Sequence, residues 1–275
     1  MTTPTPPLVF AVKSQATRDS GLHANEDIFG TEGNFAWIFD GATSASPSQQ
    51  GSSELVLALS DGIREAILSG EIDLRRIGKR GVDVAIQRLK MDSTRIPPSA
   101  AGLMCKLDGN IIEYLVLGDV TMIVRSPKSI SIVRDPGSLQ REVSYLREAK
   151  AAQRSLGEVI DQRRRAMNTQ AGYWIWSISK EAVDKAYLSH FVVSHDSWVL
   201  LASDGFLRLV DLFGSVSHDE LVLLAIDRGC DSIIDMVRSL ENDDEDRSRF
   251  SRASVHDDAS GLLLAVTNHD GHGCP

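Results

Sequence analysis

Residues 35–41 read Phe-Ala-Trp-Ile-Phe-Asp-Gly, an apolar run that ends at an aspartate followed by a glycine. Residues 198–205 (Trp-Val-Leu-Leu-Ala-Ser-Asp-Gly) end in the same pair, and residues 114–119 (Tyr-Leu-Val-Leu-Gly-Asp) end in its reverse. A fourth apolar run, residues 262–266, follows the acidic pair Asp257-Asp258. Short apolar runs bounded by turn residues are typical of strands. Acidic groups therefore lie at the ends of several expected strands.

These acidic groups form a carboxylate cluster if the fold brings the strand ends together. Carboxylates in close contact repel one another unless a cation neutralises them, and hard divalent cations prefer oxygen ligands. A divalent metal site is therefore the leading hypothesis, and Glu26-Asp27 near the start of the chain would add two acidic groups to it. The alternative is that each Asp-Gly pair is an ordinary turn, because both residues tolerate tight backbone conformations.

Composition limits the classes of function. The 275 residues are 42% hydrophobic, enough to bury a core, and 29 basic against 38 acidic residues give a net charge of −9. This charge argues against a general nucleic-acid binder or a protein of anionic membrane surfaces. No segment has about 20 consecutive apolar residues, so we expect no membrane span.

The termini and the cysteines indicate a cytoplasmic protein. Residues 1–7 are rich in proline and lack the features of a signal peptide, and we interpret them as a disordered tail. The three cysteines, Cys105, Cys230 and Cys274, fit neither a zinc site nor a disulfide framework, which favours a reducing compartment. We expect one domain over residues 8–267. Residues 268–275 are interpreted as a flexible tail, although they contain Asp-Gly-His-Gly, for which adventitious metal binding is the alternative.

Periodicity and turn residues predict a mixture of helices and antiparallel strands. Strands are expected at residues 8–13, two within 28–39, and at 101–107, 111–117, 121–125, 129–133, 199–202 and 261–266. Helices are expected at residues 52–68, capped by Ser52 or Ser53, and at 82–91, most of 139–167, 183–187, 221–227 behind a capping box at Ser217, and 232–240. The four consecutive strands between 101 and 133 are typical of an antiparallel meander, not of a parallel sheet.

Read in order, the motifs resemble those of the metal-dependent protein phosphatases of the protein phosphatase 2C family, in a divergent, bacterial-type form. The matching segments are Asn25-Glu26-Asp27, Trp37-Ile38-Phe39-Asp40-Gly41, Gly118-Asp119, Leu201-Ala202-Ser203-Asp204-Gly205-Phe206 and Asp257-Asp258-Ala259-Ser260. The resemblance implies an α+β fold, an α/β/β/α four-layer sandwich with two central antiparallel sheets. It also implies a phosphoserine/phosphothreonine protein phosphatase in which a metal-activated water attacks the phosphate monoester.

The resemblance also implies cofactors and ligands. Two Mn²⁺ or Mg²⁺ ions would bind, with a third in some members. Asp40 would bridge the two metals and Asp204 would hold the second, so these are the expected catalytic residues. The Gly41 carbonyl would be a further ligand, and Glu26 and Asp27 would hold the water shell of one metal. Asp257 would bind the second metal, and Asp119 would bind the weaker third.

Several positions depart from the family pattern. Ala42 stands where the family often has a histidine that protonates the leaving group, and alanine cannot donate a proton. Leu22 occupies the position of the arginine that binds the substrate phosphate. Arg18 is close enough in sequence to substitute for it, and a simple surface charge is the alternative. Asp258 stands where asparagine is common and adds charge without being an expected ligand. The basic run at residues 163–165 is a solvated helix face or, alternatively, a contact for an acidic or phosphorylated partner.

Three functions remain open from the sequence. The first is the phosphatase, acting on a phosphorylated protein in signalling. The second is a non-catalytic phosphatase-like module for signalling or binding, favoured by Leu22 and Ala42. The third is a hydrolase of another small phosphate ester on the same scaffold, since a fold does not determine the substrate. Retention of the clustered aspartates favours the first, because unused buried charges would cost stability.

Overall fold

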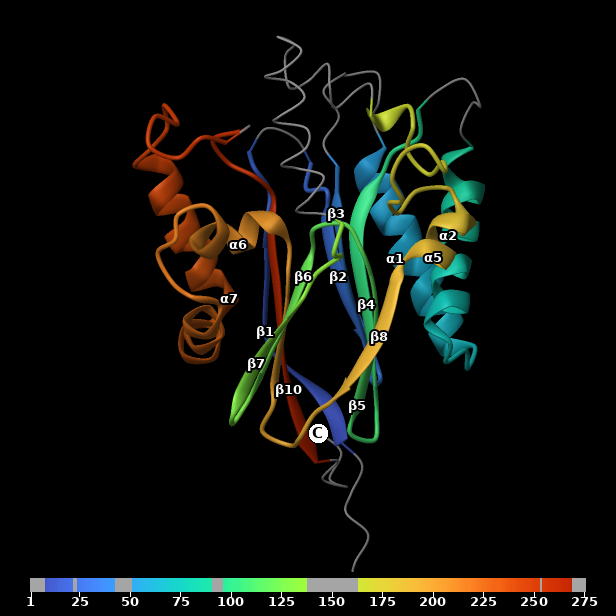
Figure 1. The fold of residues 1–275 in the computed structure, drawn as a ribbon, viewed down its shortest axis with the longest axis horizontal. Coiled ribbons are helices and arrows are strands. Elements are labelled where there is room, and N and C mark those ends of the chain that lie inside the picture. Colours follow the sequence, from blue (N-terminus) through green and yellow to red (C-terminus); the bar gives the residue numbers. More distant parts are fainter. Residues whose placement is uncertain are drawn as a thin grey trace, which may run out of the picture.

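The computed structural model describes residues 8–21, 24–42, 51–90, 96–137, 163–252 and 254–268. Two five-stranded antiparallel sheets face each other, and helices cover the outer face of each sheet (Figure 1). The α+β prediction, an α/β/β/α sandwich with two central antiparallel sheets, is therefore confirmed.

The first sheet joins the two ends of the described chain. Its strands, in order across the sheet, are β1 (Leu8–Arg18), β10 (Ala259–Asn268), β9 (Trp198–Ala202), β6 (Thr121–Ser126) and β7 (Ser129–Val133). The second sheet has the order β2 (Asp27–Glu32), β3 (Phe35–Gly41), β4 (Ala100–Asp108), β5 (Ile111–Leu117) and β8 (Tyr187–Val192). Helices α6 (Asp204–Asp211) and α7 (His218–Asn242) cover the first sheet, and α1 (Ser52–Leu68), α2 (Leu74–Leu89) and α5 (Lys180–Lys185) cover the second (Figure 1).

Strand β3 shows why the sequence forms four layers. Its side chains alternate between two apolar environments: Ala36 and Ile38 face the core between the sheets, whereas Trp37 and Phe39 face the helices. Both faces of the strand are therefore buried, which explains its continuous apolar run. Trp37 donates a hydrogen bond from Nε1 to Ser60 Oγ of α1 at 2.9 Å. Each such buried aromatic contributes about 2 kcal/mol, so β3 is a rigid base for the residues that follow it.

The predicted meander is wrong in its connectivity. The strands 100–108 and 111–117 pair with each other, as do 121–126 and 129–133, but the two pairs belong to different sheets. The chain crosses between the sheets at Gly118, whose φ of 102° is accessible mainly to glycine. Strands buried on both faces carry no pattern that separates one sheet from two, so the crossing was not predicted.

Other differences have local causes. Helix α2 begins at Leu74 instead of residue 82, because Asp73 caps it by accepting a hydrogen bond from the Arg76 amide at 2.8 Å. Gly51, not Ser52 or Ser53, is the N-cap of α1, since the Ser52 hydroxyl donates to the Ala42 carbonyl at 2.9 Å. The strand expected at residues 8–13 continues to Arg18.

The two helices predicted at 221–227 and 232–240 are one element, α7, interrupted at Gly229 with φ 81° and ψ 165°. The capping box of Ser217 and Glu220 is confirmed. Strand β8 and helix α6 were not predicted.

Some predictions lie outside the described residues: the two tails apart from Asn268, the region 138–162, and Leu22. No helix in the described residues is both long and apolar enough to cross a membrane.

Candidate metal-binding active site

Sheet pairing brings the predicted strand ends to one end of the sandwich. In the second sheet, Asp27 lies opposite Asp40, and Asp40 lies opposite Ala101 at the start of β4. The end of β5, just before Gly118-Asp119, pairs with this same start of β4. In the first sheet, Ala202 at the end of β9 lies opposite both Gly261 and Thr121. The segment Gly118-Asp119 enters the first sheet at this same end. Asp204 and the acidic pair 257–258 therefore lie at the end of the first sheet where Asp119 also lies.

Five carboxylates are close enough to alter one another's protonation. Burial raises the pKa of Asp40 well above its ordinary value of 3.8, and repulsion from its acidic neighbours raises it further. Burial and repulsion, chiefly from Asp257 and Asp119, also raise the pKa of Asp204, whereas the Arg208 guanidinium lowers it. The group consists of Asp27, Asp40, Asp119, Asp204 and Asp257. These are five of the seven predicted metal ligands.

Asp27 is the most buried member, with 7% of its surface exposed. Burial raises the pKa of Asp27 to about 7, an effect opposed by the nearby hydroxyls of Ser203 and Ser260. Neither of its carboxylate oxygens has a hydrogen-bond partner within hydrogen-bonding geometry among the described residues. A buried carboxylate without a donor or cation is costly. An oxygen-liganded divalent cation would satisfy it, so the donor set fits Mn²⁺ or Mg²⁺.

Solvent reaches the other carboxylates to different degrees. Asp40 and Asp257 are half-buried, whereas Asp119 and Asp204 are exposed. Because the Asp204 side chain is exposed, burial adds little to the cost of charging it. Repulsion from the neighbouring carboxylates is therefore the cause of its raised pKa that matters for a metal site. Within the described ranges, no three His, Cys, Asp or Glu side chains form a ready-made metal-ligand group. The donors are gathered at one end of the sheets without closing into a coordination sphere.

The glycines at 41 and 205 have a packing role. A side chain at Gly41 would lie 2.8 Å from Cβ of Glu26, and one at Gly205 would lie 2.0 Å from the carbonyl oxygen of Asp258. Neither glycine is among the residues with positive φ. The turn alternative is therefore wrong for these two Asp-Gly pairs, because each glycine lets two site segments approach. Asp108-Gly109, at the opposite end of β4, has φ 58° at its glycine and is a true turn.

An arginine from α6 binds one of the predicted ligands. Arg208 donates from Nη2 to Oδ2 of Asp257 at 2.6 Å, and its Nη1 pairs with the fully buried Glu241 of α7. Burial raises the pKa of Asp257, and Arg208 opposes this rise. The other oxygen, Oδ1, accepts from the amide of Asp258 at 3.2 Å. Asp257 is thus oriented by direct contacts on both oxygens.

Glu241 is the centre of a buried charge network behind the site. Its Oε2 accepts from Arg238 Nη1 at 2.7 Å and lies 2.8 Å from Nδ1 of His256. Arg238 also donates to the carbonyl oxygens of Asp257 and Asp19. Through Arg238, the network therefore ties the backbone at Asp257 to the backbone at Asp19.

Asp258 connects the two acidic segments from opposite ends of the chain. Its Oδ1 accepts from the amide of Ser20 at 2.7 Å, and its Oδ2 accepts from the amide of Glu26 at 2.6 Å. Two amide donors require two acceptor oxygens, which aspartate offers and asparagine does not. This pairing explains aspartate at a position where asparagine is common, and it identifies Asp258 as a residue that positions the Glu26-Asp27 segment.

Replacing Asp258 by asparagine should loosen that segment. The NH₂ group of the asparagine would face one of the two backbone N–H groups. Because both groups are donors, that buried N–H would be left without an acceptor. Hydrogen exchange at the Ser20 and Glu26 amides should accelerate about 10-fold or more relative to wild type. Asp19→Asn is the control, since Asp19 is exposed and accepts a local hydrogen bond from Gly21 at 2.9 Å. Unchanged exchange at both amides in Asp258→Asn would remove this role.

The two remaining predicted ligands and Arg18 lie beside the cluster. The carbonyl oxygen of Glu26 accepts from the Gly41 amide at 3.0 Å, which places both residues at the junction of the acidic segments. Arg18 makes an ion pair at 2.6 Å with Asp235 of α7, and this pair engages its guanidinium on the helix side. Arg18 as the substrate-phosphate residue stays a prediction, and so do the individual metal roles.

Comparison with known proteins places this arrangement in a known fold. No protein-family model matches the sequence, and no curated protein is similar enough in sequence to be counted as a relative. Among solved structures, the catalytic domain of the serine/threonine phosphatase PstP in complex with two manganese ions has a TM-score of 0.61 at 14% identity, covering 95% of this chain and 100% of that one.

Two further phosphatases are similar. MsPP from Mycobacterium smegmatis has a TM-score of 0.55 at 11% identity, covering 96% of this chain and 99% of that one. The S. agalactiae serine/threonine phosphatase has a TM-score of 0.59 at 14% identity, covering 94% and 99%. The chain has the protein phosphatase 2C fold. The resemblance of the motifs is thus confirmed at the level of the fold, and the manganese ions belong to PstP.

Within the phosphatase 2C fold, sequence reasoning missed the residues that hold the ligands in place. Arg208 follows Asp204 by one helical turn, a spacing that would have predicted their proximity if helix α6 had been recognised. Arg238 lies in the helix predicted at 232–240, but Glu241 follows its predicted end, in a stretch interpreted as a solvated loop. That interpretation is wrong for Glu241, which is fully buried within α7, because Arg208 and Arg238 pair with its carboxylate. Ala42 is held by its backbone, its amide donating to the Ser99 carbonyl at 2.9 Å.

Proposed function

We propose that this protein is a metal-dependent phosphatase that acts on phosphoserine or phosphothreonine in a phosphorylated protein. The observation that carries this proposal is the convergence of five carboxylates, from five separate segments, on one end of the sandwich. A buried, unpartnered carboxylate at Asp27 supports a cation as the missing partner. Clustered acidic side chains without a cation would only destabilise the fold.

The chain's own residues would hold and orient the reacting groups. When bound, divalent cations lower the pKa of a water molecule and draw charge from the phosphoryl oxygens. Asp40 and Asp204 would be the central ligands because each is coupled to most of the other carboxylates. Arg208 fixes the Asp257 carboxylate, and Asp258 fixes the segment of Asp27 through two amides. Preorganised ligands of this kind avoid reorganisation during the reaction.

The direct test is hydrolysis of p-nitrophenyl phosphate by the purified protein with Mn²⁺, with Mg²⁺ and with EDTA. We expect turnover that requires the metal. Absence of turnover in both metals, with the fold retained by circular dichroism, would contradict the proposal.

Loss of the leaving-group acid should be visible in the choice of substrate. Ala42 offers no proton to a departing serine alkoxide, whereas a nitrophenolate needs little protonation. Activity on aryl phosphates should therefore exceed that on phosphoserine peptides by about 100-fold or more in kcat. Ala42→His should narrow this difference. Equal rates on both substrates in the wild-type protein would show that Ala42 does not cost a proton donor.

A second candidate function is a non-catalytic phosphatase-like module. The ion pair between Arg208 and Asp257 favours it, since an arginine occupies an oxygen that a second metal would use. This candidate predicts metal binding by calorimetry with no turnover of any phosphate ester. A hydrolase of small phosphate esters instead predicts turnover of aryl phosphates that no phosphopeptide inhibits.

A further inference from the structure

Three hydroxyl groups and one side-chain amide are linked beside Asp27, whose buried carboxylate has no partner in hydrogen-bonding geometry among the described residues. The linked residues are Asn25, Thr17, Ser260 and Ser203. Ser203 and Ser260 are fully buried, and their hydroxyls lie near enough to Asp27 to oppose the rise of its pKa. These two hydroxyls are therefore candidate donors to the Asp27 carboxylate.

The side-chain amide of Asn25 has a defined orientation. Its Oδ1 accepts from the backbone amide of Asp27 at 2.8 Å, and a backbone N–H can only donate. The NH₂ group of Asn25 therefore faces Thr17, with 2.6 Å between Nδ2 and the hydroxyl oxygen Oγ1. Because an NH₂ group can also only donate, the Thr17 oxygen is the acceptor in this hydrogen bond.

Thr17 pairs with Ser260 across strands β1 and β10. Their hydroxyl oxygens are 2.6 Å apart, and only one hydrogen can lie between them. Thr17 already accepts from Asn25, and a carboxylate attracts the hydrogen of Ser260, so Thr17 is the favoured donor in this pair. Hydrogen bonds that run in one direction also polarise and strengthen one another. The hydrogen of Ser260 is then left to donate to Asp27.

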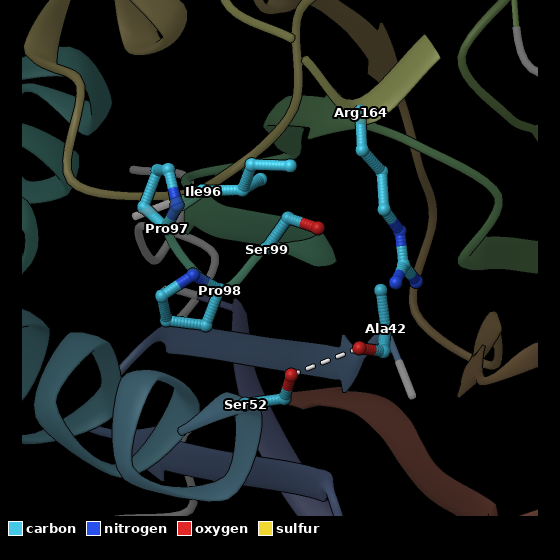
Figure 2. Close-up of a pocket in the computed structure, with 7 residues that line it drawn as sticks. All are labelled: Ala42, Ser52, Ile96, Pro97, Pro98, Ser99 and Arg164. Carbon is cyan, nitrogen blue, oxygen red and sulfur yellow. Dashed lines mark hydrogen bonds between the residues drawn. The ribbon is translucent and has the colours of Figure 1, made fainter. Parts of the chain in front are cut away.

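Ser203 offers a second hydrogen. Its hydroxyl oxygen accepts from the Ser260 amide at 2.9 Å, and its own amide donates to the Ser260 carbonyl oxygen at 3.0 Å. This double pairing holds Ser203 beside Ser260 and uses its hydroxyl oxygen as an acceptor, which leaves the hydroxyl hydrogen to donate. Ser52, another buried serine near the site, differs because its hydroxyl already donates to the Ala42 carbonyl at 2.9 Å (Figure 2).

We propose that Ser203 and Ser260 are positioning residues that donate hydrogen bonds to the Asp27 carboxylate and orient it for a bound cation. Asn25 and Thr17 fix the direction in which Ser260 donates. The terminal torsion of an aspartate is broad, so rotation of the carboxylate would align it with these donors without a change in the backbone. The inference rests on the proposed function, because it takes Asp27 as a residue of the metal site. Loss of such a partner typically weakens metal binding about 10- to 100-fold.

The first test is Mn²⁺ binding by the full chain, measured by calorimetry, with unfolding by urea followed in EDTA. Ser260→Ala and Ser203→Ala should each weaken Mn²⁺ binding about 10-fold, because Asp27 loses a donor. A merely structural role would instead lower the stability in EDTA and leave the Mn²⁺ affinity of the folded protein unchanged.

Ser197→Ala is the matched control. Ser197 is fully buried, its hydroxyl lies 2.9 Å from that of Ser126, and it lies at the opposite end of β9 from the acidic cluster. Its substitution removes the same atoms from the same sheet but should change Mn²⁺ affinity less than about 2-fold, since distant sites act independently.

The second test asks whether Thr17 acts through Ser260. Thr17 is exposed, and Thr17→Val keeps its shape while removing the hydroxyl. This variant should weaken Mn²⁺ binding about 3-fold or more, whereas Thr17→Ser should bind like wild type. Combined with Ser260→Ala, Thr17→Val should have no further effect, because both changes remove the same donation to Asp27. Additive effects would show that Thr17 acts independently and would overturn the assigned direction.

The outcomes separate this inference from the proposed function. Mn²⁺ affinity within about 2-fold of wild type in both Ser260→Ala and Ser203→Ala would overturn the inference even if the protein is an active phosphatase. A wild-type protein that binds Mn²⁺ and hydrolyses no ester would contradict the proposed function, and weakened binding in the two serine variants would still support the inference. A wild-type protein that binds no Mn²⁺ would contradict both.

Discussion

Asparagine at position 40 or 204 should abolish metal-dependent turnover, lowering kcat by about 1,000-fold or more while the fold is retained. Asparagine keeps the shape of the side chain but removes the negative charge that holds a divalent cation. Asp40 and Asp204 are each coupled to most of the other carboxylates, so neither is expected to be replaced by a neighbour. The measurement is p-nitrophenyl phosphate hydrolysis in Mn²⁺, with circular dichroism to verify the fold.

In the absence of metal, the same substitution at position 40 should stabilise the protein. Removing one charge from the cluster relieves repulsion, so Asp40→Asn should raise the melting temperature in EDTA by about 2–4 °C, equivalent to about 1 kcal/mol. The pKa of Asp40 is raised above its ordinary value of 3.8. The loss of stability caused by charging Asp40 is therefore absent below that pH and grows as the pH rises. The gain should therefore be larger at about pH 8 than at about pH 5.

Asp108→Asn is the matched control for this prediction. Asp108 also precedes a glycine at a strand end, but it lies at the opposite end of β4 and is exposed. Its substitution should change neither turnover nor the melting temperature in EDTA. If Asp108→Asn and Asp40→Asn behave alike, the acidic strand ends have no special role and the carboxylate cluster is not a functional site.

The sequence predicted the elements whose patterns are local. The apolar run 35–39 is buried on both faces, so its composition alone indicates a central strand, and the Asp-Gly ending places a carboxylate at its end. Strand β8 was missed because its residues Tyr187–Val192 are mostly exposed and lie at the edge of a sheet, where burial imposes no apolar pattern. The crossing at Gly118 was missed because pairing between distant strands leaves no trace in a local pattern.

The candidate site was also predictable from the sequence only in part. The acidic strand ends were predictable one by one, and the resemblance supplied their order. The contacts that position them were not, because Arg208 meets Glu241 across 33 residues and Asp258 meets Ser20 across 238. Such pairings depend on how helices pack on the sheets, which a single sequence does not specify. The positioning residues therefore emerged only from the three-dimensional structure.

Glu241→Ala should cost about 3–5 kcal/mol of stability. Glu241 is fully buried and accepts from Arg208 and Arg238 while lying 2.8 Å from His256 Nδ1. Without its carboxylate, two guanidinium groups remain close together in the interior with no negative partner between them. Unfolding by urea, monitored by tryptophan fluorescence, would measure the change.

A matched exposed pair provides the control for this last prediction. Glu65 of α1 pairs with Arg80 of α2 at 3.3 Å, with about half of each side chain exposed, so Glu65→Ala should cost less than about 1 kcal/mol. Glu241→Gln keeps the volume but not the charge and should lie between the two. Loss of the Glu241 carboxylate should also release Arg208 from one of its two acidic partners and loosen its hold on Asp257. Metal affinity should therefore fall in any Glu241 variant that still folds. A Glu241→Ala protein as stable as Glu65→Ala would mean that Arg208 and Arg238 are not held by this carboxylate, and the orientation of Asp257 would need another explanation.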